Sequence, residues 1–307
     1  MLSQNELKVN KIEEFAKHKI FAKELQNILS SFYRDANAKN ELSKKGESIL
    51  KCGSNLFFEH FFDENDTTRL AGANFCKHRL CPFCAWRYHL KYSKIIEKTF
   101  EILGQHEFYH LVLTIPNVKY LNKEFLINLR QNSTEFMKKT LKCEDYLISF
   151  EITVGKNGTF HPHYHILCIL QDKPTRKFLQ TEWAKVANCG KYAICDIKKC
   201  TDKRISQELT KYILKFESVK IEESKIFIIN KALKGLRKFA TNGIIKKAEK
   251  TAKKQLQAEA FDKIQKLQDF DSELLFYKWI GQSYFLESSQ KLSKENRTIN
   301  TSHTEFI

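Results

Sequence analysis

Proline, acidic side chains and long apolar runs are all scarce in this chain of 307 residues. It contains four prolines, and no apolar run approaches the ~18 residues that a helix needs to cross a bilayer. Residues 1–11 carry no hydrophobic core of a signal peptide. We therefore expect no membrane partner and a cytoplasmic location, in which cysteine side chains stay reduced.

Acidic residues are outnumbered by basic ones, with 36 Asp and Glu against 52 Lys and Arg, for a formal net charge of +16. Such an excess says nothing about the fold, but it favours binding to a polyanion. Nucleic acid is the first partner that this charge indicates, and an anionic membrane surface is the second. The length allows one large domain or two smaller ones.

The chain has no internal repeat, so its division rests on residue patterns. Residues 1–50 have apolar residues at helical spacing and predict a helical N-terminal extension. Residues 51–104 predict a small cysteine module followed by a helix, and residues 105–230 alternate strand-like and helix-like segments. Residues 231–307 predict a basic helical region, lysine-rich up to about residue 269, that ends in a polar tail.

The segments within residues 105–230 predict an α+β fold. Strands are expected over 108–115, 146–154, 159–170 and 192–197, and helices over 122–141, 175–187 and 202–216. The sequence Gly155-Lys156-Asn157-Gly158 joins the second and third of these strands and is typical of a hairpin turn.

Three of the nine cysteines fall within nine residues: Cys76, Cys81 and Cys84. Cys81 and Cys84 have the Cys-x₂-Cys spacing of a structural zinc site, and Cys52 completes a set of four thiolates. A tetrahedral site filled by four thiolates leaves no coordination position for water or substrate, so this Zn²⁺ would be structural. His78 is an alternative to Cys52 as the fourth ligand, and cysteines packed in a core are the alternative to a metal site.

Basic residues surround this group of cysteines, and they suit contacts with DNA phosphates. A solvated basic surface is the alternative explanation for each of them. The residues are Lys77, Arg79, Arg87 and Lys91.

Three histidines alternate along the predicted strand over 159–170: His161, His163 and His165. Alternation places all three imidazoles on one face of the strand. Buried imidazoles need partners for their nitrogens, and a metal ion supplies one. Glu151 lies about as far before the hairpin turn as His163 lies after it, so its carboxylate reaches the same ion.

Glu151, His163 and His165 thus form a set of three ligands that leaves positions open for water and substrate, as in a catalytic site. Mixed nitrogen and oxygen ligands suit Mn²⁺, Zn²⁺ or Co²⁺ by coordination preference, and Mg²⁺ by availability. His161 precedes a proline, and we expect it to support the site or to bind phosphate.

The predicted helix over 202–216 carries Glu208, Tyr212 and Lys215 on one side, at the border of its apolar face. Tyrosine can form covalent intermediates, but its phenol, with a free pKa of about 10, needs a nearby cation or metal ion. Lys215 and the ion are expected to supply that help. An amphipathic helix with an incidental tyrosine is the alternative.

The order of these motifs resembles that of a known family. Cys76-x₄-Cys81-Pro82-x-Cys84 is followed by Leu113-Thr114-Ile115-Pro116-Asn117, Glu151-Ile152-Thr153, the three histidines and Tyr212-Ile213-Leu214-Lys215. This series resembles the rolling-circle plasmid replication initiators of the staphylococcal small-plasmid type, within the superfamily of His-hydrophobe-His (HUH) endonucleases. The resemblance covers about residues 50–245 and fits the initiators with a single tyrosine. Tyr88 is a departure, because a second basic residue is common there.

The resemblance implies a five-stranded antiparallel sheet with flanking helices and with the metal-binding histidines at its centre. By motif, His163 and His165 match the metal-binding pair, and Glu151 matches the third ligand. Tyr212 matches the nucleophile, and Glu208 matches a glutamate that in some members acts as a base in the terminating hydrolysis. The implied activity is site- and strand-specific nicking at a double-stranded origin, which leaves a 5′-phosphotyrosine and a free 3′-hydroxyl.

The implied partners are origin DNA, both duplex and single-stranded, and a host helicase and DNA polymerase. Two alternatives stay open. A single-tyrosine transposase or mobilisation relaxase would use the same chemistry, although the cysteine module and the Leu-Thr-x-Pro-Asn strand favour an initiator. A basic, zinc-containing DNA-binding repressor without catalysis would explain the charge and the cysteines, but not the histidine and tyrosine motifs.

Overall fold

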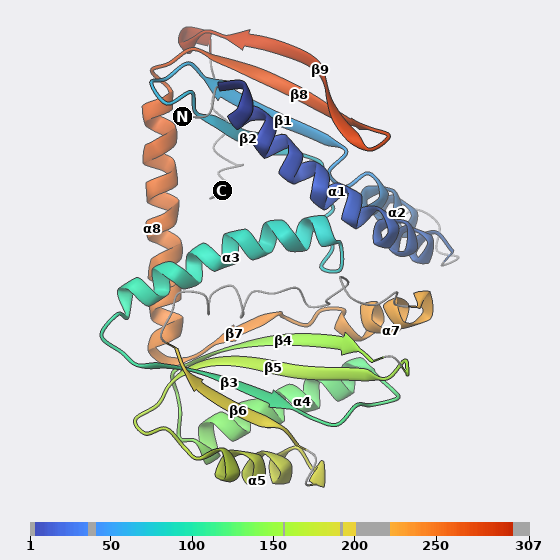
Figure 1. Cartoon of the computed structure of the whole chain (residues 1–307), viewed down its shortest axis with the longest axis vertical. Coiled ribbons are helices and arrows are strands. Elements are labelled where there is room, and N and C mark those ends of the chain that lie inside the picture. Colours follow the sequence, from blue (N-terminus) through green and yellow to red (C-terminus); the bar gives the residue numbers. More distant parts are fainter. Residues whose placement is uncertain (1–3, 36–40, 156, 191–192, 201–221, 297–307) are drawn as a thin grey trace. The chain divides into compact units, whose positions relative to one another are not determined.

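The computed structural model describes residues 4–35, 41–155, 157–190, 193–200 and 222–296 (Figure 1). This part of the chain is α+β, as predicted, and it contains two antiparallel sheets. It divides into two compact units, one formed by residues 1–91 with 254–307 and the other by residues 92–253. The boundaries fall within two long helices, α3 (Pro82–Ile102) and α8 (Gly243–Leu267). Among the described helices, none combines the length and the apolar character needed to cross a bilayer.

The unit of residues 92–253 is built on a five-stranded antiparallel sheet with the order β6-β3-β5-β4-β7. Its strands are β3 (Phe108–Thr114), β4 (Tyr146–Val154), β5 (Phe160–Ile169), β6 (Cys195–Lys199) and β7 (Phe239–Thr241). The strand with the three histidines, β5, is the central one, which confirms the sheet implied by the resemblance.

One strand of this sheet, β7, lies in a region where the sequence predicted only helix. The three-residue strand falls between α7 (Glu223–Leu233) and α8. Three residues are too few to show the alternation that identifies a strand. Contacts from elsewhere hold it in place: the ring of Phe239 stacks on Tyr92 at 4.2 Å, and the Thr241 hydroxyl donates to Glu249 at 2.8 Å.

Helices cover one face of the sheet and leave the histidines on the other. Figure 1 shows α4 (Lys123–Glu135) and α5 (Arg176–Val186) on the same side of the five strands. Their position is fixed by Trp183, which is fully buried and donates its indole N–H to the carbonyl oxygen of Thr114 at 2.7 Å. Both helices were predicted, whereas the predicted helix over 202–216 lies outside the described residues.

Apolar side chains fill the helix-covered face and are contributed by alternate positions of the central strands. They are Leu111, Leu113, Ile148, Phe150, Ile152, Tyr164 and Ile166, all buried. The residues between them, the histidines included, point to the opposite face.

The other unit contains a four-stranded antiparallel sheet, which the sequence did not predict. Its strands, in the order β2-β1-β8-β9, are β1 (Asn55–Phe61), β2 (Thr68–Ala73), β8 (Ser272–Ile280) and β9 (Ser283–Leu292). The helices α1 (Gln4–Asp35) and α2 (Glu41–Leu50) belong to the same unit.

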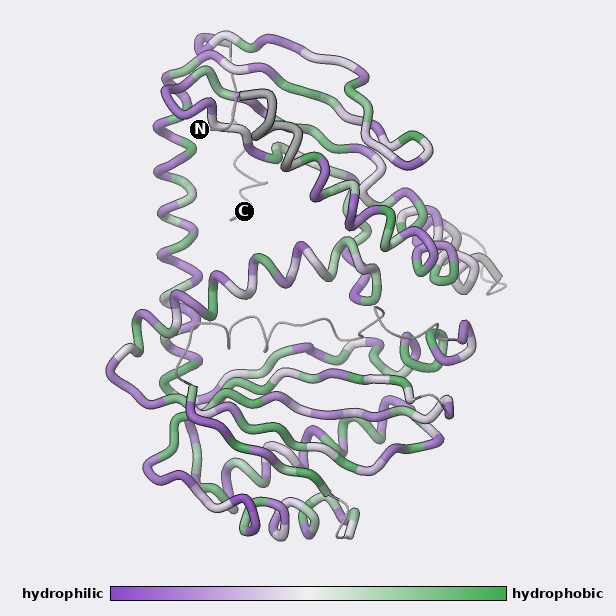
Figure 2. Tube along the Cα trace, in the orientation of Figure 1, coloured by the Kyte–Doolittle hydropathy of each residue, from purple (hydrophilic) through white to green (hydrophobic). Residues whose placement is uncertain are grey.

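The strands β8 and β9 stand where the sequence predicted helix and a polar tail. Most residues of the edge strand β9 are exposed and many are polar, so its sequence resembles that of a loop. The strand becomes evident only from its pairing with β8, which in turn pairs with β1. Figure 2 shows hydrophilic residues recurring along α8, the helix that does match the predicted lysine-rich segment.

Candidate functional site

The register of the hairpin brings Glu151 of β4 directly opposite His163 of β5. His165 follows two residues later on the same face. The Nε2 atoms of His163 and His165 lie 3.0 Å and 3.1 Å from Oε2 of Glu151. One ligand atom from each residue lies within 4.8 Å of the others. The structure therefore brings together all three residues of the predicted catalytic metal site.

The three side chains are largely buried, since those of Glu151, His163 and His165 are 4%, 11% and 13% exposed. Burying a carboxylate removes its hydration, which is costly unless a charge or hydrogen-bond donor replaces the water. Two imidazole nitrogens at hydrogen-bonding distance take that place here. Two neutral imidazole nitrogens and one carboxylate oxygen also fit a divalent ion, so these residues could hold one.

His161 lies on the same face, but it is not part of this set of three. Its ring centre is 5.4 Å from that of His163. Burial, and to a lesser extent the neighbouring His163, lowers the pKa of His161. A neutral imidazole beside the three ligands is compatible with a supporting role.

His110 on β3 also lies at the site, although it was not among the predicted site residues. Its Nε2 lies 3.1 Å from Nδ1 of His165, and the two rings stack with their centres 5.3 Å apart. His165 stands opposite Val112 in the β3–β5 register, so His110 is its diagonal neighbour on the same face. The sequence shows that residues of β3 alternate between the two faces of the sheet, but it does not show that β3 lies next to β5.

Lys238, just before β7, was also overlooked. Its Nζ lies 5.1 Å from the ring centre of Phe239. Burial lowers the pKa of Lys238 to about 7, and the charge of Glu151 opposes that shift only in part. A lysine next to the site therefore loses most of its proton affinity on folding.

This shift predicts a pH-dependent stability. Between pH 7 and 10.5 the folded chain holds fewer protons on Lys238 than the unfolded chain, so the free energy of unfolding rises with pH. We expect Lys238→Met, measured by urea unfolding in EDTA, to be more stable than the wild type at pH 7. That advantage should shrink as the pH approaches 10. A difference that stays constant across this range would contradict the assignment.

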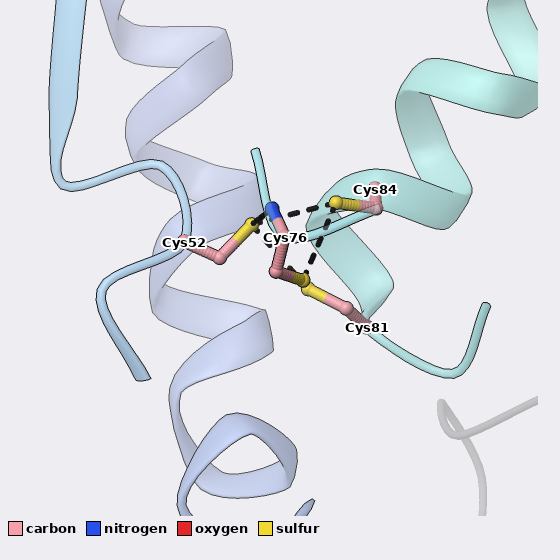
Figure 3. Close-up of side chains that lie close together, drawn as sticks. All are labelled: Cys52, Cys76, Cys81 and Cys84. Carbon is pink, nitrogen blue, oxygen red and sulfur yellow. Dashed lines mark hydrogen bonds between the residues drawn. The ribbon is translucent and has the colours of Figure 1, made fainter. Parts of the chain in front are cut away.

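The second group of predicted ligands forms a cluster in the other unit (Figure 3). The Sγ atom of Cys52 lies 3.4 Å from that of Cys84 and 3.8 Å from that of Cys81, and Cys76 lies 3.6 Å from Cys84. All four sulfur atoms fall within 4.8 Å of one another. Such convergence of four thiols fits a tetrahedral ion.

The structure distinguishes between Cys52 and His78, the two candidates for the fourth ligand of the zinc site. Cys52 stands with the other three cysteines, whereas His78 does not. Nε2 of His78 lies 3.1 Å from the hydroxyl of Tyr33, and its Nδ1 accepts the backbone N–H of Leu80 at 3.3 Å. Both ring nitrogens of His78 are thus engaged elsewhere.

Hydrogen bonds within the cluster shift the pKa values of Cys76 and Cys81 in opposite directions. Hydrogen bonds with Cys52, Cys76 and Cys84, and to a lesser extent one from Gln26, lower the pKa of Cys81. Hydrogen bonds with Cys52 and the other thiols raise the pKa of Cys76. A bound cation would stabilise the thiolate form over the thiol form in this cluster.

The helix α1 supplies part of the surroundings of this cluster. The side-chain amide of Gln26 donates to Sγ of Cys81 at 3.3 Å. Lys19, which is 4% exposed, donates to the carbonyl oxygen of Cys52 at 2.5 Å and to Gln26 at 3.0 Å. Burial lowers the pKa of Lys19, and the charges of the cysteines oppose this shift. Residues predicted as a separate extension thus contribute donors to the cysteine cluster.

One predicted phosphate contact is wrong. Arg87 is 6% exposed, and its guanidinium lies 5.5 Å from the ring centre of Phe15 and 5.0 Å from that of Phe75. An arginine sandwiched between two aromatic rings contributes to packing rather than to a DNA surface.

The predicted nucleophile and its neighbours, Tyr212, Glu208 and Lys215, lie outside the described residues. Their position relative to the metal ligands therefore stays a prediction.

Comparison with known proteins places this arrangement in a family. The family model described as a replication protein (Rep_1) matches residues 67–285. The match includes the five-stranded sheet, its three candidate ligands and three of the four clustered cysteines. The chain belongs to this family of replication proteins.

Its relatives carry the name Protein rep. The one from Streptococcus pneumoniae serotype 2 (strain D39 / NCTC 7466) is 28% identical over 207 residues, which cover 62% of this chain and 63% of the relative. The one from a Bacillus species is 30% identical over 182 residues, covering 54% and 59%. The one from Lentilactobacillus hilgardii is 29% identical over 155 residues, covering 47% and 49%. The matched part thus spans from about half to under two thirds of these relatives, and no solved structure matches the chain.

Proposed function

We propose that this protein initiates rolling-circle replication of a plasmid by nicking one strand of the origin. The observation that carries the proposal is the convergence of His163 and His165 of the central strand with Glu151 of the neighbouring strand in a replication protein. An open set of one carboxylate and two imidazoles is suited to metal-assisted phosphoryl transfer.

In this proposal the site is of the HUH type and holds Mg²⁺ or Mn²⁺. When bound, the ion would polarise a non-bridging oxygen of the scissile phosphate and offset the charge that develops there. The buried carboxylate and the two Nε2 atoms would ligate the ion from one side. Substrate and water would occupy the other side.

The phenol oxygen of Tyr212 is the proposed nucleophile. It attacks phosphorus in line, the bond from phosphorus to the 3′-oxygen breaks, and the phenol proton ends on the leaving 3′-hydroxyl. Lys215, three residues later on the same predicted helix, would favour the phenolate. The products are a 5′-phosphotyrosine and a 3′-hydroxyl that primes synthesis. At termination, Glu208 would activate the water that cleaves the regenerated origin.

Exposed lysines of α8 suit binding to the phosphates of the origin. Lys246, Lys247 and Lys250 are all exposed near the start of the helix. Contacts of this kind hold duplex or single strand without reading the bases, and they weaken as salt is added. A host helicase and DNA polymerase would then extend the nick.

The four clustered cysteines are proposed to hold a structural Zn²⁺. With four thiolates as ligands the ion has no open position, so its contribution is to the folded state alone. The N–H donors from α1 would offset part of the negative charge of the thiolates.

Adduct formation with a labelled origin strand tests the nucleophile. With Mn²⁺ present, we expect the wild type to form a covalent protein–DNA adduct and Tyr212→Phe to form none, because the phenol oxygen is removed. Tyr120→Phe is a matched control, since Tyr120 is 87% exposed and outside the motifs. Glu208→Ala should form the adduct but stall in hydrolytic release.

An adduct formed by Tyr212→Phe would refute the assignment of the nucleophile. A wild type that binds the origin duplex but never nicks it, with any divalent ion, would favour a DNA-binding repressor instead.

A further inference from the structure

We infer that His110 is a positioning residue, which fixes the tautomer and the ring orientation of His165 and so sets the affinity of the site for its ion. The inference rests on the proposed metal site of Glu151, His163 and His165. It concerns a residue on a different strand, β3, that is not one of these three candidate ligands.

The two candidate histidine ligands are held in the same way. Each directs Nε2 to the same oxygen of Glu151, at 3.0 Å for His163 and 3.1 Å for His165. Each also has a partner for Nδ1 on the other side of its ring. For His163 the partner is the carbonyl oxygen of His161, at 3.4 Å. For His165 the partner is Nε2 of His110, at 3.1 Å.

These partners determine which nitrogen carries the proton. A neutral imidazole that ligates an ion through Nε2 must carry its proton on Nδ1. A carbonyl oxygen can only accept, so the partner of His163 enforces this tautomer by itself. The partner of His165 is another imidazole, and it can accept only while its own Nε2 is unprotonated. His165 therefore has the correct tautomer when His110 is neutral and protonated on Nδ1.

Packing fixes the orientation of the same pair. The rings of His110 and His165 stack with an angle of 16° between their planes and 5.3 Å between their centres. A rotation of the His165 ring would break this stack and would also move Nε2 away from Oε2 of Glu151, from which it lies 3.1 Å. His110 thus restrains the one candidate ligand ring whose Nδ1 partner is a side chain rather than the backbone of its own strand.

The whole chain of 307 residues and Mn²⁺ alone are sufficient to test the inference. Titration followed by electron paramagnetic resonance gives the affinity for Mn²⁺. We expect His110→Phe, which keeps a ring but removes the acceptor, to weaken that affinity about 10- to 100-fold. His110→Gln places an amide near the former Nε2 and should recover most of the loss. His106→Phe is the matched control, because His106 lies in the turn before β3.

A second measurement does not depend on any variant folding. ¹⁵N NMR of the wild type loaded with diamagnetic Mg²⁺ should show a proton on Nδ1 of His165 in a hydrogen bond to Nε2 of His110. A proton on Nδ1 of His165 that is not hydrogen-bonded to His110 in this state would overturn the inference.

The outcomes separate the inference from the proposed function. If His163→Ala binds Mn²⁺ as tightly as the wild type, the proposed metal site is wrong. If His163→Ala loses binding while His110→Phe keeps it, the site stands and the role of His110 is wrong. If His110→Gln is as weak as His110→Phe, with both unfolding in EDTA at the wild-type temperature, His110 does not act through this hydrogen bond.

Discussion

His163→Ala combined with His165→Ala should abolish both Mn²⁺ binding and origin nicking. The double substitution leaves Glu151 as the only candidate ligand of the three, and one buried carboxylate does not hold a divalent ion against water. A bound ion contributes several kcal/mol to phosphoryl transfer, and about 1.4 kcal/mol is a factor of ten in rate, so we expect a loss of about 10³-fold or more.

The measurements are Mn²⁺ titration and cleavage of a labelled origin strand under single-turnover conditions. His106→Ala serves as the control because it removes an imidazole outside the site. Binding to the origin duplex should persist in the double variant, since exposed lysines rather than the histidines are proposed to contact the phosphates. Nicking that survives the double substitution and still responds to Mn²⁺ would place the ion elsewhere in the protein.

Cys81→Ser should have the largest effect on stability. Structural Zn²⁺ contributes about 10–16 kcal/mol to small zinc domains, which equals or exceeds the whole stability of a typical domain, about 5–15 kcal/mol. Cys81 is fully buried and its Sγ accepts a hydrogen bond from Gln26 of α1, so a serine there removes a ligand from the interior of the unit. We therefore expect the unit of residues 1–91 and 254–307 to unfold while the unit of residues 92–253 stays folded.

Metal analysis and thermal unfolding measure this effect. The wild type should contain one zinc ion per chain, and Cys81→Ser should contain none. Cys189→Ser is the matched control, because Cys189 is half-buried and outside the cluster. Purified wild type without zinc, together with a Cys81→Ser variant that melts at the wild-type temperature, would indicate that the cysteines are core thiols.

The parts of the site that were predictable are those linked by local geometry. Glu151 and His163 lie on two strands joined by one short turn, and a hairpin turn fixes the register of its strands. The same holds for Cys81 and Cys84, which are separated by two residues at the start of α3. In both cases the spacing in the sequence determines the spacing in the structure.

Contacts that depend on the order of strands in the sheet could not be predicted from the sequence. His110 reaches His165 because β3 is a neighbour of β5, and Lys238 reaches the site because β7 pairs with β4. Neither pairing follows from periodicity, since many orders of five strands satisfy the same apolar pattern. Lys19 and Gln26 fall in the predicted helical extension, and their contacts could not be predicted because they depend on a cluster formed by residues far along the chain.

The pairing of β1 with β8 has a consequence for synthesis of the protein. Ribosomes add about 5–20 residues per second, and about 200 residues separate the two strands, so β1 waits about 10–40 s for its partner. During that interval one edge of β1, which includes Phe57 and Phe58, has no strand beside it. Unpaired edges of this kind invite aggregation. The unit of residues 92–253 is continuous in sequence and can fold within the same interval, which leaves the nascent β1 edge as the segment most in need of a chaperone.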